Sequence, residues 1–147
     1  MYHIGDLYLS QGISGVIVSI DSSGVHGLIM SLYEANLNWY DSEKWCHNLG
    51  EGWFMPSIED FKEMRESDNL KAIQATLIQY GMPIGFGDDS RENWHGHMYW
   101  TRDFEDHYDF NNHDSMFVFC LCTGGFSMIS SDFKDQGYSY IRAMHRF

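Results

Sequence analysis

The alternation of apolar and polar positions predicts a β-hairpin near the start of the chain. Residues 16–20 are apolar and β-branched apart from Ser19, and residues 26–32 resume a strand-like pattern. Between these two runs, Asp21, Ser22, Ser23 and Gly24 are residue types that favour a tight turn. We therefore expect an N-terminal β-hairpin over residues 16–32.

Apolar residues then recur at helical spacing and predict two or three helices. The first is expected over residues 39–49, with Gly50 placed to end it. The second is expected to begin after Ser57, a favourable N-cap residue that is followed by two acidic residues. A third helix, or a kinked continuation of the second, is expected over residues 70–80, where apolar residues recur at helical spacing. It is expected to end there because Gly81 and Pro83 follow.

The C-terminal half predicts short strands that are separated by polar or glycine-containing turns. These strands are expected at residues 99–101, 116–122, 126–129 and 138–144. Residues 85–97 are rich in Gly, Asp, Asn and His without a regular period, which is typical of a long surface loop. The whole pattern predicts an α+β fold with an N-terminal β-hairpin, two to three helices and a C-terminal antiparallel sheet.

Length, composition and charge indicate the general class of protein. The chain has 147 residues, of which 44% are apolar, and this favours a single domain over residues 1–147. No apolar run approaches the roughly 18 residues that a membrane helix requires, so we expect no membrane span. The formal net charge of −12 would repel a phosphate backbone, so nucleic acid is not an expected partner.

The three cysteines allow at most one internal disulfide. Cys120 and Cys122 are two positions apart, so on a strand they would share one face in a geometry that is poor for a mutual bridge. A bridge from Cys46 is the alternative. We expect three buried thiols that behave as small apolar residues.

Four short motifs follow one another along most of the chain. They are His26-Gly27-Leu28, the segment from Leu49 to Ser57, Tyr99-Trp100-Thr101 and Ile141-Arg142-Ala143. In this order they resemble the Fib-succ major paralogous domain group, a bacterial branch of the C-type-lectin-like domains whose function is unknown. Residues 39–61 also resemble the two-helix signature of C-type lectin domains. The resemblance implies a C-type-lectin-like fold far more than it implies a function.

The resemblance also implies that the two ends of the chain lie close together and that three tryptophans lie in the core. The N-terminal hairpin and the final strand should lie in one sheet and bring the two termini close together. Trp53 and Trp100 lie in motifs that resemble the family's structural skeleton, and with Trp45 they are expected in the core.

Two departures from the family pattern limit what carries over. Residues 138–147 contain no cysteine, so the disulfide that is usual in C-type lectin domains is not expected. The calcium motifs of sugar-binding members have only a faint echo in Glu92-Asn93-Trp94, so calcium-dependent sugar binding is not expected. We expect no metal and no cofactor, because the candidate ligands form no complete set. Those candidates are Asp88, Asp89, Glu92, Asn93, His95, His97, His107 and His113.

Two segments with little periodicity, residues 85–97 and residues 103–114, form the expected ligand-binding surface. Residues 103–114 interleave aromatic and hydrogen-bonding side chains, as recognition surfaces do. An ordinary exposed connection between strands is the alternative. We expect both segments to contribute to one surface, with Trp94 and Tyr108 as anchors. The candidate residues are Arg91, Asn93, Trp94, His107, Tyr108, Asn111 and Asn112.

These features favour a non-enzymatic, bacterial ligand-binding or adhesion module whose ligand is a protein or a glycan. The alternatives are a structural subunit of a surface assembly and an enzyme that resembles the formylglycine-generating enzymes. Cys120 and Cys122 suggest that enzyme, but the apolar run before them offers no electropositive setting for an activated thiol. A cell-envelope or secreted location is expected, and a cytoplasmic location is the alternative because the first residues show no export signal.

Overall fold

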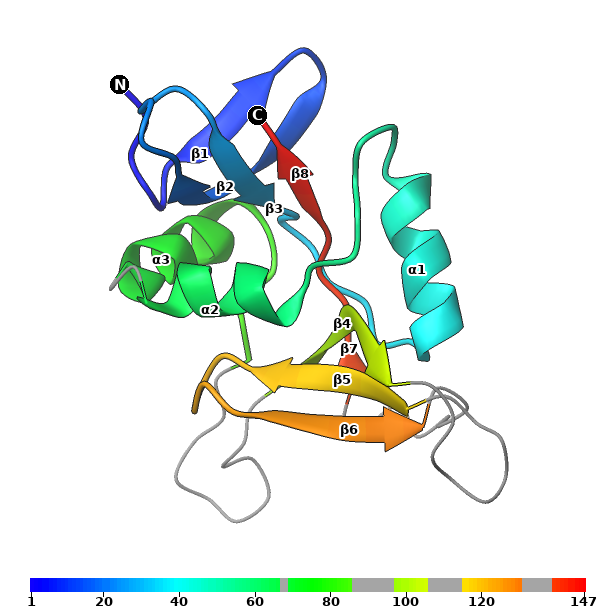
Figure 1. The fold of residues 1–147 in the computed structure, drawn as a ribbon. Coiled ribbons are helices and arrows are strands. Elements are labelled where there is room, and N and C mark those ends of the chain that lie inside the picture. The colour runs from blue at the N-terminus through cyan, green and yellow to red at the C-terminus, as the bar shows by residue number, and fades with distance from the viewer. Residues whose placement is uncertain (67–68, 86–96, 106–114, 131–138) are drawn as a thin grey trace.

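The computed structural model describes residues 1–66, 69–85, 97–105, 115–130 and 139–147. These residues form three helices and two four-stranded sheets (Figure 1). The first sheet lies at the top of Figure 1 and the second at the bottom, with α2 and α3 on one side and α1 on the other. The mixed α+β class that the sequence predicts is confirmed.

The first sheet contains the predicted hairpin and both ends of the chain. Its order is β1 (Leu7–Ser10), β2 (Ile13–Ile20), β3 (Gly27–Met30) and β8 (Met144–Arg146), and all its neighbours are antiparallel. The hairpin is confirmed as β2 and β3, while β1 was not predicted. The last strand, β8, pairs with β3 in this sheet. Near the two ends of the chain, the ring centroids of Tyr2 and Phe147 lie 5.2 Å apart, so the expected closeness of the termini is confirmed.

The second sheet has the order β6-β5-β4-β7. Its strands are β4 (Met98–Glu105), β5 (Ser115–Cys120), β6 (Phe126–Ser130) and β7 (Ser139–Tyr140). The pairs β4–β5 and β5–β6 are antiparallel, but β7 runs parallel to β4. The prediction of a purely antiparallel sheet was therefore wrong at this edge.

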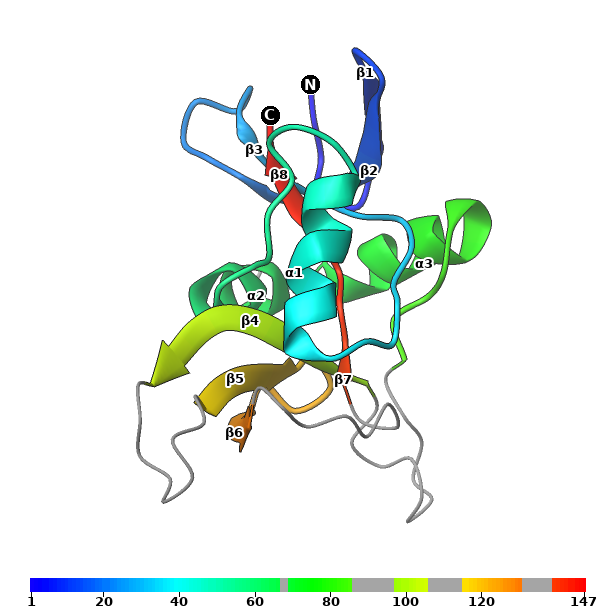
Figure 2. The same cartoon turned by 90° about the vertical axis from the view of Figure 1, so that its right-hand side faces the viewer.

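The predicted strand over residues 138–144 was also wrong, because this segment belongs to two sheets. Figures 1 and 2 show the end of the chain leaving β7 in the second sheet and reaching β8 in the first. The three connecting residues, Ile141, Arg142 and Ala143, are all 0% exposed. Ile141 both donates a backbone hydrogen bond to Ala35 and accepts one from it, which fixes the position of this crossing.

The helices begin where the sequence supplies capping groups. The side chain of Asn38 accepts a hydrogen bond from the Asp41 backbone N–H at the start of α1 (Trp39–Asn48). Ser57 and Asp60 each accept from the other's backbone N–H before α2 (Ile58–Glu66), which forms a reciprocal capping pair. The helix predicted over residues 70–80 is α3 (Leu70–Tyr80).

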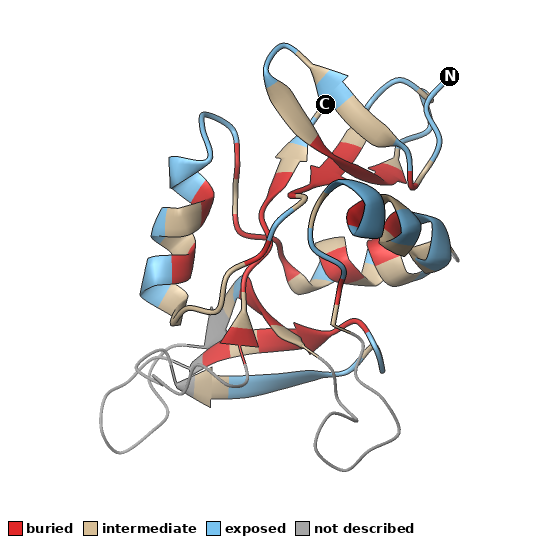
Figure 3. Ribbon diagram, turned by 180° about the vertical axis from the view of Figure 1, so that it is seen from behind, coloured by how far each residue is buried: buried red, intermediate tan, exposed pale blue. Residues whose placement is uncertain are grey.

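The inner parts of β2 and β3 are buried between two apolar clusters (Figure 3). Val16 and Val18 belong to a cluster that contains the apolar residues of α2 and α3, whereas Ile17 belongs to a cluster with Cys46 of α1. Trp53 and Trp100 are 8% and 0% exposed in this second cluster, so their core role is confirmed. Trp45 is only half-buried, and it packs against the edge of the same cluster.

The three cysteines, all of which the structure describes, form no disulfide. Cys46 and Cys120 are buried as expected, but Cys122 is exposed. The prediction for Cys122 was wrong because β5 ends at Cys120, and Cys122 lies in the turn that follows.

Candidate functional site

The ligand-binding residues predicted from the sequence lie outside the described residues. This applies to all seven of them, namely Arg91, Asn93, Trp94, His107, Tyr108, Asn111 and Asn112. Their common surface therefore stays a prediction. Among the candidate metal ligands only His97 is described, and its Nδ1 lies 2.8 Å from Oε2 of Glu34. Within the described ranges, no group of three or more His, Cys, Asp and Glu side chains is placed to hold a metal ion.

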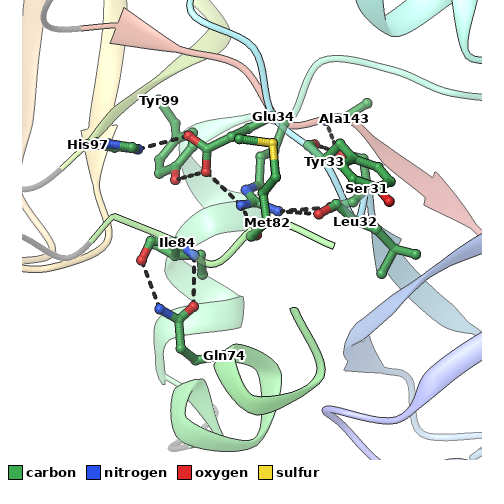
Figure 4. A network of polar contacts seen from close by, with 11 residues as sticks. Ser31, Leu32, Tyr33, Glu34, Gln74, Met82, Ile84, His97, Tyr99 and Ala143 are labelled. Carbon is green, nitrogen blue, oxygen red and sulfur yellow. Dashed lines mark hydrogen bonds and ion pairs between the residues drawn. The ribbon is translucent and has the colours of Figure 1, made fainter. Parts of the chain in front are cut away.

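A buried polar network lies between the two sheets (Figure 4). Its centre is an ion pair in which Arg142 Nη2 lies 2.6 Å from Glu34 Oε1, and the two side chains are 0% and 1% exposed. Tyr99 donates its hydroxyl to the same carboxylate oxygen over 3.0 Å, and His97 contacts the other oxygen. Both oxygens of Glu34 are therefore satisfied by side chains of β4, of the residue just before β4 and of the final crossing.

The network keeps Glu34 ionised and Tyr99 protonated. Burial would raise the pKa of Glu34, but the hydrogen bond with His97 and the charge of Arg142 hold this pKa below its ordinary value. Burial is the main reason that the pKa of Tyr99 lies above its ordinary value, so its hydroxyl remains a donor. Glu34 and Arg142 have almost no exposed surface, so the contacts of this charged pair are with the protein around it.

Arg142 also fixes the chain that leaves β3. It donates to the carbonyl oxygens of Ser31 and Leu32 over 3.1 and 3.2 Å, and to that of Met82. Ser31 Oγ in turn donates to the carbonyl oxygen of Tyr33 and accepts from the backbone N–H of Ala143. The backbone of residues 31–33 is thus held by the network.

Residues 31–33 form one wall of a surface pocket of about 150 Å³. The other walls come from residues 12–14 at the start of β2, from α1 and its C-terminal end, and from the connection before α2. Three aromatic side chains contribute: Tyr33 is 56% exposed, Trp45 is half-buried and Trp53 is mostly buried. The described lining residues are Gly12, Ile13, Ser14, Ser31, Leu32, Tyr33, Trp45, Leu49 and Trp53.

The tryptophans of this pocket differ from two others in their hydrogen bonding. The indole N–H groups of Trp39 and Trp100 donate to backbone oxygens of Thr101 and Leu37 over 2.9 and 2.8 Å. Neither Trp45 nor Trp53 donates to any acceptor in the described part of the chain, and neither indole nitrogen is fully enclosed. These two donors are free to bind water or a ligand.

A larger and more open groove of about 510 Å³ lies between the first sheet and α2. Its floor includes Val18 and Ile20, while α2 contributes Glu59, Glu63 and Glu66 together with Lys62. Lys62 lies 3.8 Å from Glu59, and both side chains are substantially exposed. This is the arrangement of an ordinary solvated helix face, so the aromatic pocket is the stronger candidate.

The sequence did not single out the aromatic pocket, because its walls come from four separate segments. Trp53 and Trp45 were assigned to the core, and they do pack there, but both also reach the pocket. The available signal was Tyr33, an aromatic residue that directly follows the predicted strand and lies next to a charged residue.

A scan against protein-family models and a search of curated proteins give no match to this sequence. The fold and the site are therefore interpreted from the residues themselves. None of the helices in the described residues is both long enough and apolar enough to cross a membrane. What the geometry defines is a mixed α+β protein with an uncharged aromatic pocket beside α1.

Proposed function

We propose that this protein is a non-enzymatic ligand-binding or adhesion module with a C-type-lectin-like fold, of bacterial origin. We further propose that the aromatic pocket beside α1 is part of its binding surface for a protein or a glycan. The observation that carries this proposal is the pocket itself. Its lining combines the exposed ring of Tyr33, two tryptophans whose indole N–H groups have no acceptor in the described residues, and a backbone wall held by buried hydrogen bonds.

The positions of the sequence motifs support the proposed fold. Gly27 allows β3 to approach β2, because a Cβ atom at this position would lie 2.0 Å from the carbonyl oxygen of Ser19. Gly52 has a φ of 87°, a backbone conformation that favours glycine, next to the buried Trp53. Arg142 lies at the centre of the network, and the first and last strands share one sheet. The motifs thus serve the scaffold, and Leu49 and Trp53 of the second motif also line the pocket.

Rigid aromatic surface is the physical reason to expect binding at this pocket. Aromatic rings bury a large area while losing little conformational entropy, and a preformed wall lowers the ordering cost of association. Concave, mostly apolar sites with a few polar groups are the usual form of ligand sites. The pocket has this form, and its lining residues include the hydroxyls of Ser14 and Tyr33 and the indole groups of Trp45 and Trp53 as polar elements.

The test is a glycan array and a protein array probed with the full chain, with and without calcium. For any ligand found, Trp45→Ala should weaken binding by about 1–3 kcal/mol, whereas Phe126→Ala should have little effect. Phe126 is a matched control because it is an exposed ring, 51% accessible, on β6 in the second sheet.

The expected loop surface is tested on the same arrays with a Trp94→Ala, Tyr108→Ala double variant. If the double variant loses binding and Trp45→Ala does not, the binding site lies in the two loop segments and the aromatic pocket is not part of it. Arrays without any bound ligand, in either calcium condition, would argue against a binding module.

A further inference from the structure

We propose that the aromatic pocket accepts one large uncharged side chain of a protein partner, rather than a sugar ring. This inference rests on the proposed function, since it names the ligand class of the same pocket. The preferred partner segment carries an aromatic or large aliphatic residue with basic residues beside it.

The chemistry of the lining favours a side chain over a sugar. None of the nine described lining residues has a charged or amide side chain. A sugar ring carries several hydroxyl groups, and each one that is buried without a partner carries a free-energy penalty. Ser31 already uses its hydroxyl within the protein, so the hydroxyls of Ser14 and Tyr33 and the two indole N–H groups are the polar side-chain groups left for a ligand. This set contains no carboxylate or amide group to hold neighbouring sugar hydroxyls.

The size of the pocket fits a single anchor residue. Its volume of about 150 Å³ is well below the range of roughly 300–1,000 Å³ that is typical of sites enclosing a whole small molecule. Protein interfaces commonly concentrate their binding energy in one aromatic or large apolar residue that fills such a depression. The indole N–H groups of Trp45 and Trp53 can then bind backbone carbonyl oxygens next to the anchor, as an extended peptide presents them.

The net negative charge of the chain favours basic residues beside the anchor residue of the partner. The pocket lining is uncharged, but the chain as a whole has a formal net charge of −12. A segment whose anchor is flanked by Lys or Arg is therefore attracted to the surface, while its neutral anchor enters the pocket. Acidic flanking residues are repelled, and this difference should shrink as salt is added.

The experiment uses the full chain labelled with ¹⁵N and observes its five tryptophan indole resonances by NMR, assigned with single Trp→Phe variants. The probes are acetyl-Lys-Trp-Lys-amide, acetyl-Lys-Ala-Lys-amide, acetyl-Glu-Trp-Glu-amide and neutral methyl hexopyranosides. The Lys-Trp-Lys peptide should shift the Trp45 and Trp53 resonances, whereas those of Trp39 and Trp100 should stay in place. The Ala peptide and the glycosides should cause no shift, and the Glu-Trp-Glu peptide should bind more weakly at low salt.

Two variants test whether the pocket is responsible. Tyr33→Ala changes a residue that is more than half exposed, so it should leave the fold intact and weaken the Lys-Trp-Lys peptide about tenfold or more. Phe126→Ala should leave that affinity unchanged. Circular dichroism and thermal melting verify that both variants are folded.

The outcomes separate this inference from the proposed function. Shifts of Trp45 and Trp53 caused by a glycoside would overturn the side-chain assignment and leave the binding module in place. Equal shifts with the Ala and Trp peptides would also overturn it, because no anchor would be needed. If no probe shifts either resonance, the inference fails, and the array experiment alone decides the proposed function.

Discussion

Replacing Arg142 by methionine should destabilise the protein more than any other single ion-pair change in the described residues. The substitution keeps an apolar chain of similar length but removes the positive charge beside Glu34, whose side chain is 1% exposed. Tyr99 and His97 would remain as its side-chain partners. The carbonyl oxygens of Ser31, Leu32 and Met82 would lose their shared donor.

The expected magnitude follows from burial. Removing one partner of a buried ion pair typically costs about 3–5 kcal/mol, because the other charge stays uncompensated in the interior. That is a large share of the roughly 5–15 kcal/mol by which domains are usually stable. The matched control is Arg102→Met. Arg102 is 50% exposed and 3.9 Å from Asp60, and such a pair contributes less than about 1 kcal/mol.

Urea unfolding, followed by tryptophan fluorescence and by circular dichroism, measures both variants against the parent. A third variant, Glu34→Gln with Arg142→Met, removes both charges and should recover part of the lost stability. The reasoning would be refuted by an Arg142→Met protein within about 1 kcal/mol of the parent, or by equal losses for Arg142→Met and Arg102→Met.

Three further predictions concern acid, thiols and a glycine. The pKa of Glu34 is lowered in the folded state. Its contribution to stability is therefore complete above its unfolded pKa and is lost as pH falls through its folded pKa. A curve of stability against pH should fall less steeply on its acid side for Glu34→Gln than for the parent protein. Burial raises the pKa of Cys46 to about 12, whereas Cys122 is exposed. Iodoacetamide at mildly alkaline pH should therefore modify Cys122 and leave Cys46 unmodified until urea unfolds the chain. Mass spectrometry of peptides measures the modification of each cysteine. Gly27→Ala should destabilise the protein by about 1–3 kcal/mol, since the added Cβ meets the backbone of Ser19. At Gly125 the added Cβ meets only the side-chain hydroxyl of Thr123, at 3.3 Å, so Gly125→Ala should change the melting temperature much less; similar melting temperatures for the two variants would contradict this.

Local signals explain why much of the fold could be predicted. The hairpin and the start of α2 depend on neighbouring residues: Asp21 binds the backbone N–H of Ser23 in the turn, and Ser57 and Asp60 cap the helix mutually. Such contacts span two or three positions, so the residue types alone indicate them. The helical spacing of α3 is equally local, and its Ile73 is fully buried as that spacing implies.

Non-local contacts explain what the sequence could not indicate. Glu34 and Arg142 are separated by 108 positions, and nothing near Glu34 marks it as a buried carboxylate. The sequence favoured one continuous strand over residues 138–144, because an apolar and aromatic run looks the same whether it serves one sheet or crosses between two. The pocket depends on four segments that are separated in the sequence and meet only in the folded chain.

The position of Arg142 connects the scaffold to the proposed binding surface. This side chain lies in the crossing between β7 and β8, and its guanidinium reaches the backbone of Ser31 and Leu32. The same backbone leads directly to Tyr33, the most exposed ring of the pocket. An exposed ring on an unsupported connection would lose much of its binding energy to ordering, whereas a connection already held by buried hydrogen bonds does not. In this proposal a buried charge pair, which by itself adds little net stability compared with apolar packing, has a use: its arginine holds the backbone of two residues that line the pocket.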